Sequence, residues 1–237
     1  MDAAALRHEM AAENLAHAHM PGYRRRIVQQ STFSTLLENQ ADKTEYGRHL
    51  GTTVRDLDDI TVQLDFTRGN LKQTERNLDL ALEGEDGFLV VNGPQGPLYT
   101  RNGSFVASPD GRLVTVDGLA VAGQNGDIDI PPGISSEAIE ITPDGRLLNE
   151  GVEFDRLRTV RFDDPNGLVP IGASLFTAPN DVAPVPSEEV FLSGYVETAN
   201  VAHMDELINI MVASRQYEAA QKALNAVDET LERRIEG

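Results

Sequence analysis

The sequence predicts a mainly β fold: an antiparallel β domain, sandwich-like or barrel-like, with an α-helix at each end of the chain. Asn-Gly or Asp-Gly pairs recur through the middle, at 102–103, 110–111, 117–118, 125–126 and 144–145. Such pairs tolerate positive φ and favour tight hairpin turns. Short runs of Val, Ile, Leu, Phe and Thr lie between them, and many short strands at close spacing indicate an antiparallel domain.

Individual strands and turns support the same interpretation. Residues 127–130 alternate Asp and Ile, which predicts one wet face and one buried face, and residues 158–162 show a similar pattern. The run Pro-Asp-Gly-Arg-Leu occurs at 109–113 and again at 143–147. We interpret the recurrence as two similar turns and not as a repeat architecture.

The N-terminal segment predicts a short helix. Residues 1–19 are rich in Ala, and neither Gly nor Pro occurs before Pro21 and Gly22. A helix should therefore end before Pro21. Its apolar surface is small, so it would be marginal in water by itself.

The C-terminal segment predicts a long amphipathic helix. No Gly or Pro occurs between Asn200 and Gly237, and apolar residues recur at spacings of three and four. Met204, Ile208 and Met211 widen this stripe near its start. The helix could dock on its own sheet domain, or it could pair with the N-terminal helix and with neighbouring subunits. Periodicity leaves these two alternatives open. The stripe contains Leu207, Ile210, Ala213, Tyr217, Ala220, Leu224, Val227 and Leu231.

Four segments follow from these patterns. We expect an N-terminal assembly helix over 1–20, a partly extended connecting arm over 21–77, a β domain over 78–194 and a C-terminal amphipathic assembly helix over 195–237. The arm is the least regular of the four, because it is polar with scattered apolar residues.

Composition restricts the classes of partner. The net charge of −18 disfavours nucleic acid and anionic membrane surfaces. The basic run Arg24, Arg25 and Arg26 is too short to reverse this, and we expect it to be a solvated or subunit-contacting patch. The chain has no cysteine, so neither disulfides nor thiolate chemistry is available. The first residues do not resemble a secretory signal peptide, and no run predicts a membrane helix.

The sequence predicts no enzyme activity, no cofactor and no metal site. The five histidines lack zinc-ligand spacing, and His17 and His19 point to different sides of a helix. Acidic clusters at 56–59 and 83–86 are expected in so acidic a chain, and we interpret them as solvated. A hydrolase with paired carboxylates would need two such groups converging in a pocket with a raised pKa.

Three stretches together resemble the rod and hook proteins of the bacterial flagellum. Many fixed positions agree in the middle block, which makes it the most specific. The residues that carry the resemblance are 13–16 and 21–24 near the N-terminus, 77–84, 87–91, 99–105 and 111–115 in the middle, and 194–201 before the last helix. Within the family, residues 51–55, 69–74 and 194–201 look most like the distal rod protein, with the proximal rod protein second. His17, Met20, Ser214 and Ala220 depart from the family pattern.

The resemblance implies a structural subunit of the basal-body rod, which assembles with itself into a helical axial filament that transmits torque. It also implies that the two terminal helices pair as a coiled coil. Implied partners are other rod and hook proteins and the flagellar type III export apparatus, with export that needs no cleaved signal peptide. The alternative is an extracellular β binding module with a helical anchor, which the low aromatic content disfavours. The implied assembly residues are Asn14, Leu15, Pro21, Gly22, Tyr23, Asn200, Val201, Leu207, Ile210, Arg215, Tyr217, Leu224, Val227 and Leu231.

Overall fold

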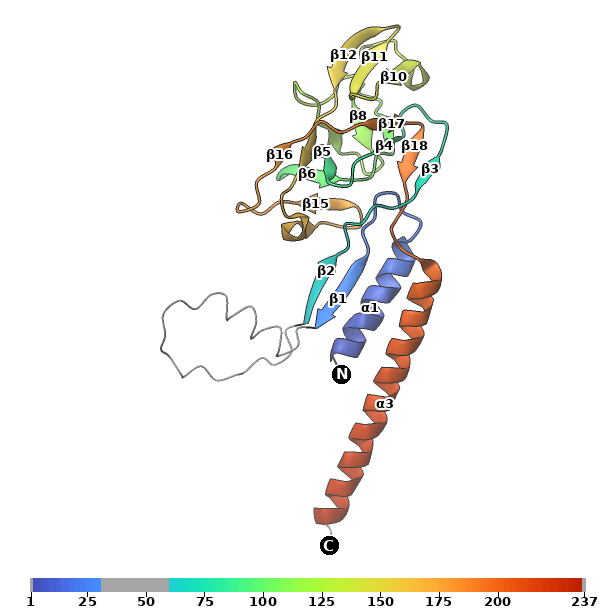
Figure 1. Ribbon diagram of the computed structural model, residues 1–237, viewed down its shortest axis with the longest axis vertical. Helices are drawn as coiled ribbons and strands as arrows, with labels where there is room; N and C mark the ends of the chain where they lie inside the picture. Colours follow the sequence, from blue (N-terminus) through green and yellow to red (C-terminus); the bar gives the residue numbers. More distant parts are fainter. Residues whose placement is uncertain (1, 31–59, 236–237) are drawn as a thin grey trace, which may run out of the picture. The chain divides into compact units, whose positions relative to one another are not determined.

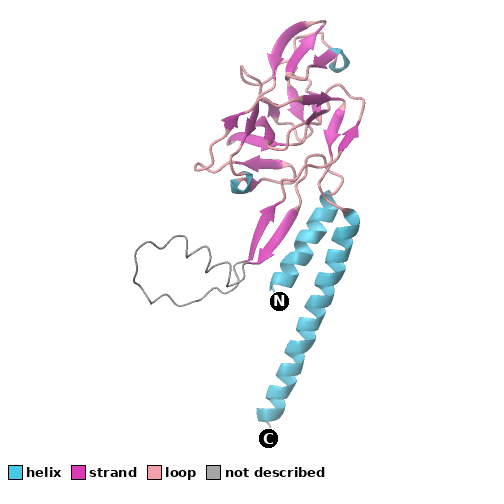
Figure 2. Ribbon diagram, viewed as in Figure 1, coloured by secondary structure: helices cyan, strands magenta, loops and turns pink. Residues whose placement is uncertain are grey.

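Both ends of the chain form helices where glycine and proline are missing from the sequence. In the computed structural model, which describes residues 2–30 and 60–235, α1 spans Asp2–His17 and α3 spans His203–Ile235 (Figure 1). Helix α1 ends before Pro21, because the residue before a proline is disfavoured in helical conformation. Both predicted helices are confirmed, and the remaining elements are almost all strands (Figure 2).

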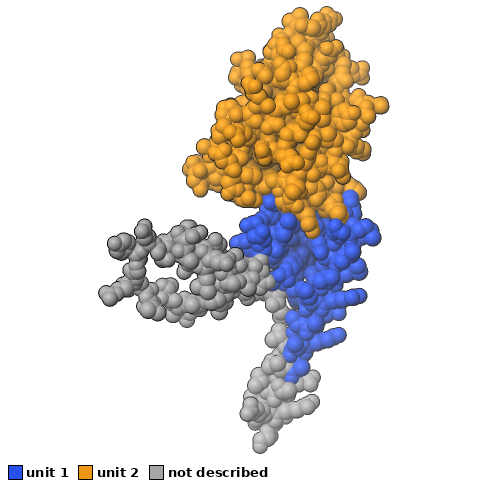
Figure 3. Space-filling model, viewed as in Figure 1, with its two compact units in different colours: residues 1–15, 26–64, 203–237 blue, residues 16–25, 65–202 orange. Residues whose placement is uncertain are grey.

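The chain divides into two units, and each unit gathers segments that are distant in sequence (Figure 3). Unit 1 contains both helices and a two-stranded sheet, in which β1 (Arg26–Gln30) pairs antiparallel with β2 (Ile60–Leu64). Unit 2 contains the other sheets. Unit 1 consists of Met1–Leu15, Arg26–Leu64 and His203–Gly237, and unit 2 consists of Ala16–Arg25 and Asp65–Ala202.

Unit 2 is built from antiparallel sheets, as the turn pattern predicts. Its largest sheet has nine strands, with β5 in a central position between β6 and β9. That sheet contains β5 (Gly87–Gly93), β6 (Gly96–Thr100), β7 (Phe105–Ala107), β8 (Leu113–Thr115), β9 (Ala120–Val121), β13 (Thr159–Arg161), β14 (Val169–Pro170), β15 (Leu175–Thr177) and β16 (Val185–Pro186).

Smaller sheets complete unit 2. Two of them join early strands to late ones, because β3 pairs with β18 and β4 pairs with β17. A third sheet has the order β10, β11, β12. The strands are β3 (Leu71–Gln73), β4 (Leu80–Leu82), β10 (Ile139–Ile141), β11 (Arg146–Asn149), β12 (Val152–Arg156), β17 (Phe191–Ser193) and β18 (Tyr195–Glu197), and two 3₁₀ turns lie at Ser136–Ala138 and Pro165–Gly167.

Four of the five predicted turn glycines have positive φ, namely Gly111, Gly118, Gly126 and Gly145. The two Pro-Asp-Gly-Arg-Leu turns share one hydrogen-bond pattern, since the glycine N–H donates to the carbonyl oxygen three residues earlier in both. Gly103 is different. A Cβ at this position would lie 1.9 Å from the carbonyl oxygen of Leu80. Glycine is therefore needed here because two backbone segments lie close together, and not because of turn geometry.

The main core of unit 2 is aliphatic. Fifteen buried residues, mostly Leu, Ile and Val, form one cluster that includes Leu113, Ile128 and Leu147. The predicted alternation over 127–130 is confirmed, because both isoleucines are buried and both aspartates are exposed. Residues 158–162 do not alternate. Thr159 and Val160 are both buried although neighbouring side chains of a strand point to opposite faces, so both faces of β13 are covered at this point.

Aromatic residues form a second cluster in unit 2. Its members meet at ring-centroid distances of 4.8 to 6.0 Å, mostly edge to face, which is the favoured geometry for such rings. Five of the thirteen Phe and Tyr residues of the sequence therefore contact one another in this cluster. The cluster contains Phe66, Phe88, Tyr99, Phe162 and Phe176.

The turn between β11 and β12 is strained and can be improved. Glu150 and Gly151 form its two-residue loop with φ of 50° and 80°, values that suit Asn-Gly. Because a residue such as Glu is disfavoured at positive φ, we predict that Glu150→Asn stabilises unit 2 by about 0.5–1 kcal/mol in denaturant unfolding. Glu150→Gln is the control, since it removes the charge but keeps the strain. Equal stability of both variants would contradict this explanation.

Candidate assembly site

The segment after α1 is buried in unit 2. Tyr23 is fully buried and packs with Ala18, Ala199 and Val201, which come from both ends of the chain. Its ring stacks on that of His17 with a centroid distance of 5.2 Å. The aromatic residue of the N-terminal motif is thus a core residue, and it joins the C-terminal motif to the N-terminal one.

Gly22 is required by close packing. Its φ is +70°, and a Cβ here would lie 2.3 Å from the backbone nitrogen of Asn102. The Gly22 N–H donates to the carbonyl oxygen of Glu197 at 2.8 Å. Any larger residue would clash with the backbone of Arg101 and Asn102, so the glycine of the motif allows these backbone segments to meet.

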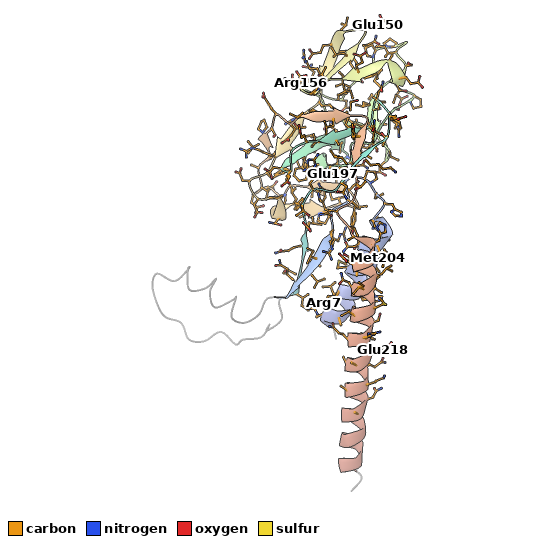
Figure 4. All side chains as sticks on the ribbon, turned by 45° about the vertical axis from the view of Figure 1, so that its right-hand side comes forward. Arg7, Glu150, Arg156, Glu197, Met204 and Glu218 are labelled. Atoms are coloured by element: carbon orange, nitrogen blue, oxygen red, sulfur yellow. The ribbon has the colours of Figure 1, made fainter. Side chains whose placement is uncertain are left out.

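Glu197 is the centre of a buried ion cluster. Arg24 Nη2 lies 2.6 Å from Glu197 Oε1, and these two side chains are 0% and 1% exposed. The backbone N–H of Gly69 donates to the same oxygen at 2.8 Å. Arg101 Nε lies 3.8 Å from the other carboxylate oxygen. One carboxylate therefore faces two buried guanidinium groups, and Figure 4 labels its residue among the side chains of unit 2.

Arg101 also holds a neighbouring loop. Both terminal nitrogens of its guanidinium donate to the Gly84 carbonyl oxygen at 2.9 Å, and Nη2 also donates to that of Glu85. Burial lowers the pKa of Arg101 to about 10, while the nearby Glu197 carboxylate opposes this shift. Arg101 therefore remains charged at neutral pH and needs its counter-ion.

One asparagine in each unit binds backbone groups with its side-chain amide. In unit 2, Asn200 Oδ1 accepts from the Arg25 N–H at 2.8 Å, and Asn200 Nδ2 donates to the Asp65 carbonyl oxygen at 2.8 Å. In unit 1, Asn14 Oδ1 accepts from the Arg26 N–H at 2.8 Å while its Nδ2 donates to the Arg26 carbonyl oxygen at 2.9 Å. Both side chains thus hold the backbone of the segment that follows α1.

The prediction for the basic run was wrong. Arg24 is 1% exposed and bonds to Glu197, so it is a core residue and not part of a solvated patch. Arg26 is partly buried and forms an ion pair with Glu13 at 2.7 Å. Composition could not show this, because the acidic partner of Arg24 lies 173 residues later in the chain.

The side of α3 that faces α1 carries part of the apolar stripe predicted for this helix. Ala213 is buried, and Ile210 and Ala220 are partly buried. Leu207 and Tyr217 are each 43% exposed. Among the other predicted assembly residues, Val201 is buried, Leu15 and Pro21 are partly buried, and Arg215 is exposed. The side chains of Leu224, Val227 and Leu231 lie outside the described part of the chain.

A groove separates α1 and α3. The two helices lie side by side and run in opposite directions, and Arg7 of α1 lies beside the stretch of α3 between Met204 and Glu218 (Figures 1 and 4). Four of the seven residues that line the groove are Ala or Ser, and the groove has a volume of about 440 Å³. Its lining is Ala4, Ala5 and His8 from α1, and Ala213, Ser214, Tyr217 and Glu218 from α3.

Helix α3 has a second apolar face, which the sequence pattern alone did not distinguish from the predicted stripe. Its side chains are 43% to 70% exposed. Spacings of three and four place them on one side of the helix, away from Ala213. We call this set the exposed stripe, and it consists of Met204, Leu207, Ile208, Met211 and Val212.

A polar pocket of about 300 Å³ in unit 2 shows little sign of acid–base chemistry. Its Asp144 accepts a hydrogen bond from Thr142 Oγ1, and this bond, followed by that from Arg146, lowers the pKa of the Asp144 carboxyl group. A general acid would need a raised pKa.

Within residues 2–30 and 60–235, no three His, Asp or Glu side chains are arranged to hold a metal ion. In the same part of the chain, no helix is both long and apolar enough to cross a membrane.

Two family models match the chain. One describes the "Flagellar hook protein FlgE/F/G D1 domain" and matches residues 81–148, and the other describes the "Flagellar basal body rod FlgEFG protein C-terminal" and matches residues 192–236. The flagellar basal-body rod protein FlgG of Agrobacterium fabrum is 31% identical, over 97% of this chain and 92% of its own length. The chain belongs to the flagellar basal-body rod protein family.

Other rod proteins are similar over most of their length. FlgG of Buchnera aphidicola from Acyrthosiphon pisum is 30% identical, over 98% of this chain and 94% of its own. FlgF of Salmonella typhimurium is 29% identical, over 93% of this chain and 87% of its own. As a rod protein, the chain is a structural subunit of the flagellum and belongs to the basal body. The matched regions include Arg101, Glu197 and the described part of α3.

Replacing the buried carboxylate should destabilise this rod protein strongly. Glu197→Gln removes the carboxylate that pairs with buried Arg24 and Arg101, and removal of one partner from a buried pair costs about 3–5 kcal/mol. Glu140→Gln makes the same chemical change at an exposed position of β10 and should cost less than about 0.5 kcal/mol. Denaturant unfolding monitored by circular dichroism measures both. Equal effects would show that the ion cluster does not hold unit 2 together.

Proposed function

We propose that this rod protein polymerises into a helical filament through α1 and α3, which pair as an antiparallel coiled coil in unit 1. The antiparallel arrangement and the burial of Ala213 support this. On α1, Met10 and Ala11 are also buried. Small side chains along both helices permit close approach of the two backbones.

The exposed stripe carries the proposal, because it provides a surface for a neighbouring copy. Apolar patches of this kind on a soluble protein are typical of interaction sites. Each of its side chains is about half exposed, so covering it would contribute on the order of 1 kcal/mol. One such contact is weak, but a polymer repeats the contact along its whole length and therefore gains stability as it grows.

We further propose the partners and the location. The filament would lie in the rod, with other rod and hook proteins at its ends, and it would transmit torque. The chain would reach it through the flagellar type III export apparatus without a cleaved signal peptide. Within the rod we favour the distal segment, on the sequence similarity of residues 69–74 and 194–201. Residues 51–55, which also carry that similarity, lie outside the described residues.

The test is a charge placed in the exposed stripe. Ile208→Asp should leave the melting of unit 2 unchanged, because Ile208 is 50% exposed and lies in unit 1. The same variant should lose filament formation in electron micrographs, and it should fail to restore motility to cells that lack the protein.

Gln216→Asp is the matched control, since it places the same residue at an exposed position of α3 outside the stripe. It should assemble like the unchanged protein. Normal filaments and motility with Ile208→Asp would refute the proposed role of this face.

A further inference from the structure

The turn over residues 123–126 differs from the other glycine turns of unit 2 in its hydrogen bonds. In the Asp-Gly turns, the N–H groups of Gly111, Gly118 and Gly145 each donate to the carbonyl oxygen three residues earlier. Gly126 is exposed, and its carbonyl oxygen accepts from the Gly123 N–H at 2.7 Å. Its own N–H has no acceptor within residues 2–30 and 60–235. Because most backbone N–H groups of a fold have a partner, this open nitrogen is unusual.

Asn125, which precedes this glycine, is equally unconstrained. Its side chain is exposed, and its amide bonds to no other described residue. Gly126 has a φ of +127°, and a Cβ built on it would meet nothing within 4 Å. No side chain therefore hinders the approach of the Gly126 nitrogen to the side-chain amide of Asn125.

We propose that Asn125 is a site of spontaneous deamidation. After losing its proton to base, the Gly126 nitrogen attacks the Asn125 side-chain carbonyl carbon. A C–N bond forms there, the bond from that carbon to Nδ2 breaks, and ammonia leaves, which gives a five-membered succinimide ring. Water then opens the ring at either carbonyl and yields aspartate or isoaspartate. Water is the only other reactant, and nothing is oxidised or reduced.

The sequence has three other Asn-Gly pairs, and the fold holds each of them. Asn92 belongs to β5, and its Nδ2 donates to Asp127 Oδ1 at 2.5 Å. Asn102 Oδ1 accepts from the Ser104 N–H at 3.0 Å, and the glycine that follows Asn102 is buried. The three pairs lie at 92–93, 102–103 and 166–167.

Asp164 engages both reacting groups of the pair at 166–167. Its Oδ1 accepts from Asn166 Nδ2 at 3.0 Å, and its carbonyl oxygen accepts from the Gly167 N–H at 3.4 Å. Asn125 is thus the member of the four pairs whose side-chain amide has no bonding partner among the described residues. The dipeptide is the same in all four pairs, so the fold selects the reactive one.

The products would change the turn in two ways. Both add a negative charge two residues before Asp127, in a chain whose net charge is already −18. Isoaspartate also adds one methylene to the backbone, and the bond from the Gly123 N–H to the Gly126 carbonyl oxygen spans that position. Hydrogen exchange should therefore become faster at Gly123. It should not change at Ile128, whose N–H donates to Val121 and whose side chain is buried in the core.

Peptide mapping of the aged protein tests the site. The full-length protein is kept folded in mildly alkaline buffer, digested with pepsin in acid and analysed by mass spectrometry, which distinguishes amide from acid at each pair. We expect Asn125 to deamidate several-fold faster than Asn92, Asn102 or Asn166. The three other pairs are internal controls. In strong denaturant, the four rates should become similar, because the native bonds and packing are lost.

The outcomes separate the fold from local sequence. Similar rates at all four pairs in the folded protein, or a faster reaction at another pair, would overturn the inference. A preference for Asn125 that persists in denaturant would also overturn it, because the neighbouring residues would then be the cause. Asn125→Gln is the variant control, since glutamine would have to form a slower six-membered ring. It should lose most of the isoaspartate that an isoaspartyl methyltransferase labels in the aged protein, and undiminished labelling would contradict the assignment.

Discussion

The buried contact between Arg24 and Glu197 is the interaction on which the rest of this structure depends. Arg24 follows the N-terminal helix by a few residues, and Glu197 ends the last strand before the C-terminal helix. Their side chains meet at 2.6 Å, away from solvent. Burying charged groups is costly, so the contact needs further partners. The Gly69 N–H donates to the same carboxylate, and the Arg101 guanidinium places a second positive charge beside it. The segment that follows α1 and the strand that precedes α3 are thereby joined within unit 2.

This constraint explains why the terminal motifs contain the residues they do. Gly22 must be glycine because the segment lies against Asn102, and Tyr23 must be large because it fills the space between the two chain ends. Asn200 then ties Arg25 to Asp65 by its side-chain amide. The motif residues of unit 2 therefore support the fold, while the exposed stripe that we propose as a contact surface lies on α3.

The exposed stripe relates this fold to the proposed polymer. Ala213 of α3 is buried, whereas Met204 is 70% exposed and Met211 is 54% exposed. Helix α3 therefore has one covered side and one exposed apolar side, and the proposed filament would use the exposed one.

The sequence predicted local structure well and long-range contacts poorly. The turn glycines and the helix ends could be predicted because they follow from the conformational limits of Gly and Pro. The burial of Arg24 could not, because a charged residue is buried only when its partner is, and Glu197 is far away in sequence. The helical stripe was predicted as one surface, although Ala213 is buried and Met204 is 70% exposed. Periodicity identifies an amphipathic helix, but it does not say which helix covers which side.

A double-mutant cycle between Arg24 and Glu197 tests the central claim most directly. The unfolding free energies of Arg24→Met, Glu197→Gln and the double variant are compared with that of the unchanged protein. If the buried pair joins the segment after α1 to the strand before α3, the coupling energy should be at least about 1.5 kcal/mol, as for close buried charge pairs. Effects that add within about 0.5 kcal/mol would contradict the account, because the two side chains would then contribute independently.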